Sequence, residues 1–195
     1  MAKYGAKYLQ WAPFAATKAD EDESKYPLYA APMNLGALVK VTDAPSVQEA
    51  TIYGDDDVDE AVTEVCEYTA DAEITELSNE VASAVFGAKL NTGENDADLV
   101  HGTDDNPPWG GLAFYIRKKV NGATAFQGIY YPKLKASVQG DEYTTKGGTV
   151  TLTGGKIHFK GTNAKNGAWK VKSKNFPTQA EAKAWVDAKI KASAS

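Results

Sequence analysis

The residues from Val62 to Ile74 alternate between apolar and polar side chains, and this pattern constrains the fold more than any other feature of the sequence. The even-numbered positions are apolar apart from Glu64, whereas the odd-numbered positions carry hydroxyl or carboxylate groups or, at position 65, a valine. A period of two is typical of a β-strand that buries one face and exposes the other. The segment is therefore predicted to be a half-buried strand.

Two glycine-containing turns predict hairpins elsewhere in the chain. Asn121-Gly122 separates Leu112–Val120 from Thr124–Val138, and this residue pair accepts the positive φ angles of a tight turn. Gly154-Gly155 separates two further runs, Thr149–Leu152 and Lys156–Lys160. Shorter strands are expected at Gly36–Val41, Gln48–Tyr53 and Ala168–Lys172.

Capping residues predict two short helices. Ser78 is placed to cap the first helix and Gly87 to end it. Thr178 and Glu181 form a capping box at the start of the second helix, which is expected to span residues 178–192. The first helix is expected to bury Val81, Ala84 and Val85, and the second Ala182, Trp185, Val186 and Ile190. Together these signals predict a mainly β, antiparallel sandwich or barrel-like domain with a short flanking helix and a C-terminal helix.

The first 35 residues show little periodicity and contain three prolines. They are therefore expected to form an extended N-terminal arm and loop, followed by a single β-rich domain over residues 36–195. The arm is nevertheless rich in aromatic side chains, which a free arm would leave in water. We expect such an arm to lie on its own domain or on a neighbouring molecule.

The composition excludes several classes of protein. Because Cys66 is the only cysteine, the chain has no internal disulfide, and its place on the apolar face of the strand predicts a buried, inert thiol. The sequence has no apolar run of about 18 residues and no secretory signal pattern, so we expect a protein that stays in a reducing cytoplasm. A chain of 195 residues can build a core without a stabilising metal.

Charge is distributed very unevenly along the chain. Residues 1–110 hold 22 acidic and 6 basic side chains, whereas residues 111–195 hold 4 acidic and 15 basic side chains. Two solvated faces of one domain would explain this asymmetry, and so would two complementary surfaces for self-assembly. The densest acidic stretch, residues 54–60, spaces its carboxylates like a calcium loop. Glu60 stands where that loop needs glycine, so no EF-hand is predicted, although another divalent site is left open.

Nothing in the sequence predicts catalysis. The chain has two histidines, His101 and His158, and no nucleophile-elbow pattern. Gly154-Gly155-Lys156 lacks the first glycine and the hydroxyl residue of a phosphate-binding loop. We therefore expect a protein that is not an enzyme, uses no cofactor or metal, and works through shape and assembly.

Several segments, in order along the chain, resemble the major tail proteins of long-tailed, non-contractile bacteriophages and prophages of Gram-positive bacteria. The resemblance covers most of the chain, although no single motif is diagnostic. The matching segments are the opening MAKYGAKYLQWAPF, Ile52–Asp56, Ile74–Gly87, Gly110–Lys119 with Tyr130–Lys133, and Phe176–Thr178 with Ala182 and Trp185.

The resemblance implies a tail tube fold and a structural role in the virion. Six subunits would join their sheets into a ring with an inner β-barrel, and rings would stack head to tail around a tape measure protein. The implied partners are other copies of the chain, the tape measure protein, a tail terminator and distal tail or baseplate proteins. The tube would be assembled in the cytoplasm of the host bacterium and would later conduct genomic DNA without reading its sequence.

Two sets of residues are candidates for this role. Carboxylates and hydroxyls do not bind phosphates, so a surface that carries them lets DNA slide. The candidate lumen surface is therefore the face of the alternating strand that holds the odd-numbered residues Glu67, Thr69, Asp71 and Glu73. The alternative is that this face is an ordinary outer surface. The arm and the acidic turn are the candidate contacts between subunits or rings; their residues are Tyr4, Tyr8, Trp11, Phe14, Asp55, Asp56, Asp57, Asp59 and Glu60.

Other functions fit the same patterns. The chain could be the inner tube of a contractile tail or tailocin, a head decoration protein or a tail terminator. A protein of a different class, a β-sandwich carbohydrate-binding module, would use Trp11, Trp109 and Trp169 as stacking platforms.

Overall fold

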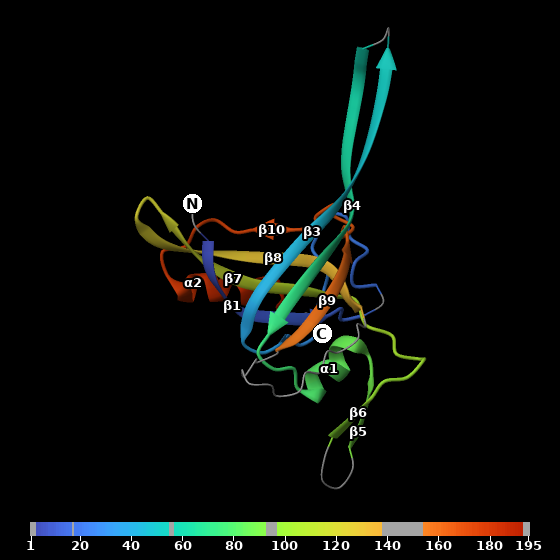
Figure 1. The fold of residues 1–195 in the computed structure, drawn as a ribbon, viewed down its shortest axis with the longest axis vertical. Helices are drawn as coiled ribbons and strands as arrows, with labels where there is room; N and C mark the ends of the chain where they lie inside the picture. Colours follow the sequence, from blue (N-terminus) through green and yellow to red (C-terminus); the bar gives the residue numbers. More distant parts are fainter. Residues whose placement is uncertain (1–2, 17, 55–56, 93–96, 138–153, 193–195) are drawn as a thin grey trace, which may run out of the picture.

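The computed structural model confirms a mainly β, antiparallel fold with two helices (Figure 1). It describes residues 3–16, 18–54, 57–92, 97–137 and 154–192, with only the backbone of residues 3, 50–54, 57–62, 92 and 97. Among these residues, one eight-stranded sheet has the order β2-β1-β7-β8-β9-β4-β3, and β10 also pairs with β8. Its strands are β1 (Lys3–Pro13), β2 (Met33–Asn34), β3 (Leu38–Gly54), β4 (Asp57–Ile74), β7 (Gly110–Val120), β8 (Ala123–Ser137), β9 (Gly155–Thr162) and β10 (Val171–Lys172); β5 (Lys89–Thr92) and β6 (Ala97–Val100) form a separate hairpin.

The long strand β8 divides the sheet into two parts. Its residues Ile129 and Tyr130 pair with β10, whereas the segment from Leu134 to Ser137 pairs with β9. On the other side, the pairing with β7 shifts register between Leu112 and Gly110. Such an irregularity bends a strand, and here it lies where β8 changes partner.

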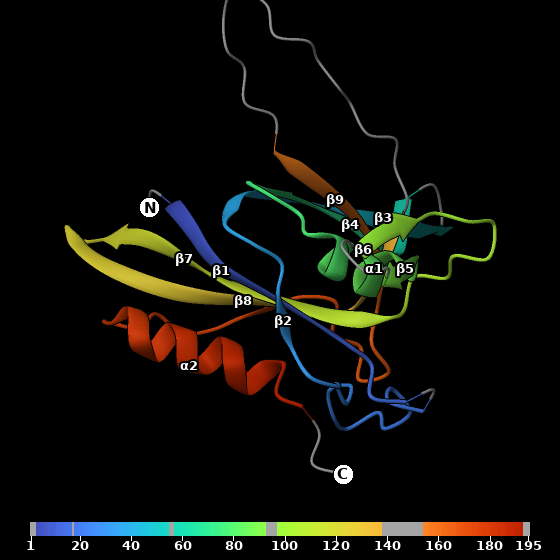
Figure 2. The same ribbon diagram turned by 90° about the horizontal axis from the view of Figure 1, so that it is seen from below.

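Hydrophobic side chains pack on both faces of β1, β7 and β8, and alternate residues of β7 enter different cores. Phe114 belongs to a core that includes Phe159 of β9, Tyr68 of β4 and Val85 of the first helix. Tyr115 belongs to a second core, which the second helix closes from the other side of the sheet (Figure 2). Because both faces are covered, most of β7 is a continuous buried run rather than an alternating one.

Both predicted helix starts are confirmed. The first helix, α1 (Asn79–Phe86), is capped by Ser78 and ends at Gly87, which has a φ of 69°. Val85 is fully buried, and Val81 and Ala84 are partly buried against the same core, so the predicted apolar face is confirmed; Ala82, which was not predicted, is buried as well.

The second helix, α2 (Gln179–Lys189), begins with the predicted capping box of Thr178 and Glu181. Ala182, Val186 and Ile190 are fully buried, as predicted. Trp185 is half-buried and packs against Gly128 of β8, where an added Cβ would come within 2.2 Å of its ring. The helix is thereby fixed to the sheet over β8.

The N-terminal segment corrects the sequence prediction. Residues 3–13 are not an arm without a core, because β1 lies inside the sheet between β2 and β7, and Leu9 and Trp11 are fully buried. The strand is irregular: its register with β7 shifts twice, and Gly5 and Tyr8 have φ angles of 64° and 61°. These two irregularities erase the period of two that would have identified a strand.

Other predicted boundaries also change. Gly36–Val41 and Gln48–Tyr53 were expected to be separate strands, but both fall largely in β3, which runs through Pro45 as the outermost strand of the sheet. The strand predicted at Ala168–Lys172 is reduced to Val171–Lys172, and the first half of the predicted Gly154-Gly155 hairpin lies outside the described residues. Cys66 is free and half-buried rather than buried, because it lies where the β3–β4 register shifts.

Candidate assembly surfaces

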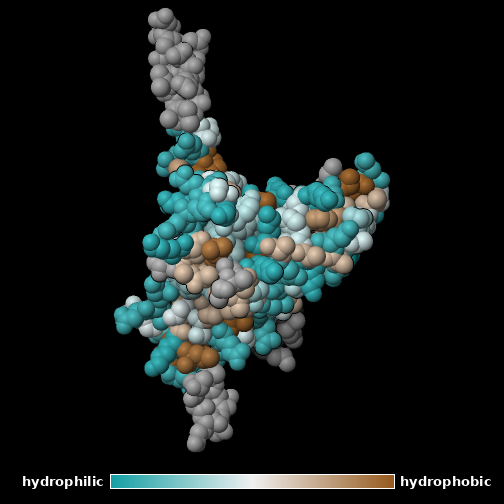
Figure 3. Space-filling view, turned by 180° about the vertical axis from the view of Figure 1, so that it is seen from behind, coloured by the Kyte–Doolittle hydropathy of each residue, from teal (hydrophilic) through white to brown (hydrophobic). Residues whose placement is uncertain are grey.

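A two-stranded ribbon projects from one end of the molecule (Figure 1). Strand β9 pairs with β4 from Glu67 to Ile74, so among the described strands residues 57–66 of β4 pair with residues 47–54 of β3 alone. We call residues 47–66 the acidic ribbon. Val47, at its base, is 45% exposed, and hydrophilic and hydrophobic atoms lie together there (Figure 3). An isolated pair of strands is at best marginally stable in water, so the ribbon gains stability from any surface that covers it.

The ribbon is strongly acidic. Residues 47–66 contain seven acidic side chains and no basic one. The candidate contact residues of the acidic turn belong to it, and the backbone places Asp57, Asp59 and Glu60 near its tip. Their side chains, and Asp55 and Asp56 altogether, lie outside the described residues. Their proposed contact with a neighbouring ring stays a prediction.

The candidate lumen residues lie together on the face of β4 that points away from the core. The predicted alternation is confirmed, because Tyr68 and Ile74 are no more than 2% exposed whereas Glu67, Thr69, Asp71 and Glu73 are exposed or half-buried. The pairing of β4 with β3 and β9 sets Glu73 between Lys40 and Lys156. It sets Asp71 between Thr42 and His158 in the same way.

Asp71 has two close polar neighbours on β9. Lys156 Nζ lies 3.2 Å from Asp71 Oδ2, and the imidazole Nδ1 of His158 is hydrogen-bonded to Asp71 Oδ1. Partial burial raises the pKa of Asp71, but the hydrogen bonds with His158 and Lys156 outweigh it and leave the pKa below its ordinary value. The carboxylate is therefore ionised and already paired at neutral pH.

The face as a whole is not acidic, which corrects the expected character of a lumen surface. The row that contains Thr69 also contains Lys160 of β9 and Lys135 of β8, and the row that contains Glu73 also contains Lys40 of β3 and Lys156 of β9. The alternation along one strand shows which residues share a face. It does not show which residues of distant segments stand beside them.

The aromatic residues of β1 and its continuation are largely engaged within the molecule. Trp11 is fully buried, so it cannot contact a neighbouring subunit as predicted. Phe14 packs against Tyr29, with ring centroids 5.8 Å apart. The Tyr8 hydroxyl donates to Asp187 at 2.8 Å, and burial together with this bond raises the pKa of Tyr8 to about 12. Tyr4, which is 42% exposed, is the most accessible of the four.

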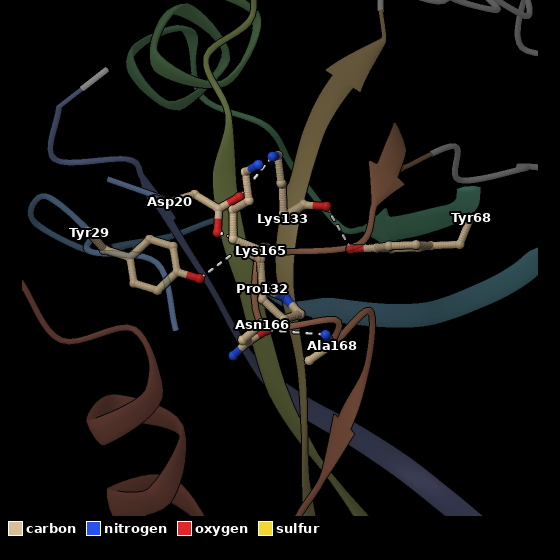
Figure 4. A network of polar contacts seen from close by, with 8 residues as sticks. All are labelled: Asp20, Tyr29, Tyr68, Pro132, Lys133, Lys165, Asn166 and Ala168. Atoms are coloured by element: carbon tan, nitrogen blue, oxygen red, sulfur yellow. Dashed lines mark hydrogen bonds and ion pairs between the residues drawn. The ribbon is translucent and has the colours of Figure 1, made fainter. Parts of the chain in front are cut away.

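A polar network holds the bend of β8 in place (Figure 4). The hydroxyl groups of Tyr29 and Tyr68 donate to the carbonyl oxygens of Pro132 at 2.6 Å and Lys133 at 2.8 Å. Asp20, whose side chain is 5% exposed, accepts from Lys133 Nζ at 2.7 Å and from the backbone N–H of Lys165 at 3.0 Å. The sequence carries no local signal for this role of Asp20, because its partners are far away in the sequence.

The three tryptophans of the carbohydrate-binding alternative do not form a common platform. Trp11 is buried, and the ammonium groups of Lys133 and Lys135 lie 5.4 Å and 5.2 Å from the centre of the Trp109 ring. Trp169 lines an open cavity of about 500 Å³ with Asp43, Lys170 and Lys172. Lys170 Nζ and Asp43 Oδ2 lie 2.6 Å apart in this cavity.

The described residues bring no metal site together, since they hold no group of three His, Cys, Asp or Glu side chains suited to bind an ion. Each histidine instead faces one aspartate; His101 Nδ1 lies 3.2 Å from Asp105 Oδ2. No described helix is long and apolar enough to cross a membrane. No protein-family model matches the chain, and no curated protein matches its sequence.

Proposed function

We propose that this chain is the structural subunit of a bacteriophage tail tube. Copies join side by side into rings of six, and the rings stack into a hollow conduit that delivers DNA into the host cell. The resemblance of several sequence segments to major tail proteins supports this proposal. In the assembled virion the partners are other copies of the chain, the tape measure protein, the tail terminator and the distal tail or baseplate proteins.

The acidic ribbon is the observation that carries the proposal. A monomer gains nothing from extending two strands of this length into water, because a lone hairpin buries too little surface to offset the entropy of ordering it. When another copy covers the ribbon, the surface buried between the two copies offsets the entropy of ordering it. A contact between two different surfaces of identical molecules repeats without closing and produces a filament.

The edges of the sheet support lateral assembly. Among the described strands, β3 lies at one edge and extends over 17 residues, whereas the two-residue β2 lies at the other. An unpaired edge presents backbone N–H and C=O groups to any other strand and promotes uncontrolled association. Closure of the subunits into a ring covers these edges in a defined way.

The face that contains Asp71 and Glu73 remains the proposed surface of the bore. DNA slides where few free cations contact its phosphates. Glu73 stands in register between Lys40 of β3 and Lys156 of β9, and Lys156 also forms an ion pair with Asp71, which reduces the attraction of these two lysines for phosphate. The proposed wall is therefore mixed in charge rather than acidic.

The test compares the full chain with a variant that lacks the ribbon. Ser46 and Glu67 are directly opposite in the β3–β4 register, so an Asn-Gly turn can join them in place of residues 47–66. We expect the full chain to form rings or tubes in sedimentation velocity and negative-stain microscopy. The trimmed variant should stay a folded monomer, as judged by circular dichroism. Tubes formed by the trimmed variant, or a full chain that remains monomeric at high concentration, would contradict the proposal.

A further inference from the structure

Two lysines on the proposed wall of the bore form no ion pair with any carboxylate in the part of the chain that the structure describes. Lys135 of β8 and Lys160 of β9 are directly opposite each other, and Lys160 also pairs with Thr69 of β4, so the three side chains form one row on one face of the sheet. We call Lys135 and Lys160 the lysine pair; the first is half-buried and the second exposed. Like charges directly opposite each other destabilise a sheet, so an anion bound between these ammonium groups stabilises the row.

The other two lysines of this face have carboxylate neighbours. Glu73 stands in register between Lys40 and Lys156, and Lys156 Nζ lies 3.2 Å from Asp71 Oδ2. A carboxylate so close to an ammonium group competes with phosphate for it. On the described part of this face, the uncompensated positive charge is therefore concentrated in the lysine pair.

The indole ring of Trp109 helps to position one member of the pair. The ammonium groups of Lys135 and Lys133 lie 5.2 Å and 5.4 Å from the centre of this ring. Lys133 is also bound to the buried carboxylate of Asp20, which compensates its charge (Figure 4). A cation over an aromatic ring is attracted to the ring but keeps its charge. Trp109 therefore holds Lys135 in place without reducing its attraction for an anion.

The strip that attracts anions is only one row wide. Residues two positions apart on a strand share a face, so Glu67 and Asp71 border the row of Thr69 at about 7 Å along β4. Glu67 is exposed and repels a phosphate that moves toward it, since 7 Å is within the Debye length of about 8 Å at physiological salt. Asp71 is paired with Lys156 and offers no free cation on the other side. A polyanion therefore meets two free ammonium groups on each subunit.

We infer that the lysine pair binds phosphates of double-stranded DNA as the DNA passes along the bore. The inference rests on the proposed function and adds to it one weak DNA contact for each subunit. Lysine binds phosphate as a point charge and reads no base, so the contact is independent of sequence. A duplex carries one negative charge for about every 1.7 Å of its axis, so some phosphate lies beside the pair at every stage of the passage. Two ammonium groups hold DNA weakly enough to release it.

Binding of a short, fluorescently labelled DNA duplex to the full chain tests the inference. Fluorescence anisotropy gives the affinity at salt concentrations from about 20 to about 200 mM, a range over which phosphate contacts weaken strongly. K135Q/K160Q should bind about tenfold more weakly than the control at the lowest salt. The slope of log affinity against log salt should be smaller by about 2, or one for each lost phosphate contact.

K40Q/K156Q is the matched control. It removes two lysines from the same face and changes the net charge of the chain by the same amount, so general repulsion between protein and DNA increases equally in both variants. Its lysines already stand beside Glu73, so their loss should remove little direct contact with phosphate. The difference between the two variants therefore measures the contribution of the lysine pair.

Sedimentation of the unaltered chain, measured in parallel, separates this inference from the proposed function. If the chain assembles but K135Q/K160Q binds the duplex as well as the control does, the lysine contact is wrong while the proposed function stands. The same holds if the assembled chain binds no duplex at low salt. If K135Q/K160Q weakens binding of labelled poly-glutamate but not of the duplex, an acidic protein segment replaces DNA as the ligand. Should circular dichroism show that K135Q/K160Q folds poorly, K160Q alone, at an exposed position, decides the question. An unaltered chain that never assembles contradicts the proposed function itself.

Discussion

Four buried tyrosines predict that the protein unfolds steeply in alkaline solution. Tyr29, Tyr68, Tyr130 and Tyr131 are each no more than 2% exposed. Burial is the largest cause that raises the pKa of all four hydroxyls well above the ordinary value of 10.0. In the unfolded chain the same hydroxyls ionise from about pH 10. Above that pH the unfolded state therefore binds fewer protons than the folded state, so stability falls as pH rises.

The size of the loss follows from this difference in ionisation. Each tyrosine that stays neutral in the folded state but has a pKa of 10 when unfolded removes about 1.4 kcal/mol of stability at about pH 11. Four such residues remove about 6 kcal/mol, which is comparable with the whole stability of many domains. We therefore expect cooperative unfolding between about pH 10 and about pH 12, with the native state retained below this range.

The measurement follows secondary structure by circular dichroism and tyrosine ionisation by near-ultraviolet absorbance in one alkaline titration. The two signals should change together, because the buried hydroxyls ionise only when the chain unfolds. Tyr131→Phe removes one of the four groups, so it should reduce the dependence of unfolding free energy on pH by about 1.4 kcal/mol per pH unit. Gradual ionisation of all the tyrosines while the circular dichroism remains native would refute the reasoning.

Three further predictions concern stability in urea at neutral pH. Gly161→Ala should destabilise the fold by about 1–3 kcal/mol, because the new Cβ would lie 2.2 Å from the Tyr68 ring. Gly102→Ala is the control and should be close to neutral, because its Cβ would have no atom nearer than 3.9 Å. Equal effects of the two substitutions would disprove the packing argument. Thr178→Ala removes the capping box of α2 and should cost about 1 kcal/mol, and an unchanged urea midpoint would count against this role. Lys170→Met leaves the half-buried Asp43 carboxylate without its ammonium partner and should cost about 2 kcal/mol, a loss that should largely disappear in the background of Asp43→Asn.

The elements that the sequence predicts correctly are governed by neighbouring residues. Asn121 and Gly122 have φ angles of 49° and 83°, as a tight hairpin turn requires, and Thr178 and Glu181 form their capping box within a single turn of helix. The alternation of β4 is visible because the core lies on only one of its faces. Strand β1 is hidden by its two irregularities, and a period cannot be recognised across them.

The features that were missed depend on residues far apart in the sequence. The Asp71–His158 hydrogen bond spans 87 positions, and the Asp20–Lys133 bond spans 113. Tertiary pairing alone brings such residues together, so the charge balance of the face of β4 and the role of Asp20 have no local signal. The ribbon is a feature of the same kind, because it begins where β9 ends, at the Glu67–Thr162 pair, and β3 and β4 continue beyond that point.

The cross-section of the assembly formed by the purified full chain tests the central claim most directly. Cryo-electron microscopy should show rings with an open axial hole, stacked through contacts that include residues 47–66. A filament with a solid centre, or a preparation that contains only separate monomers at high concentration, would contradict the account.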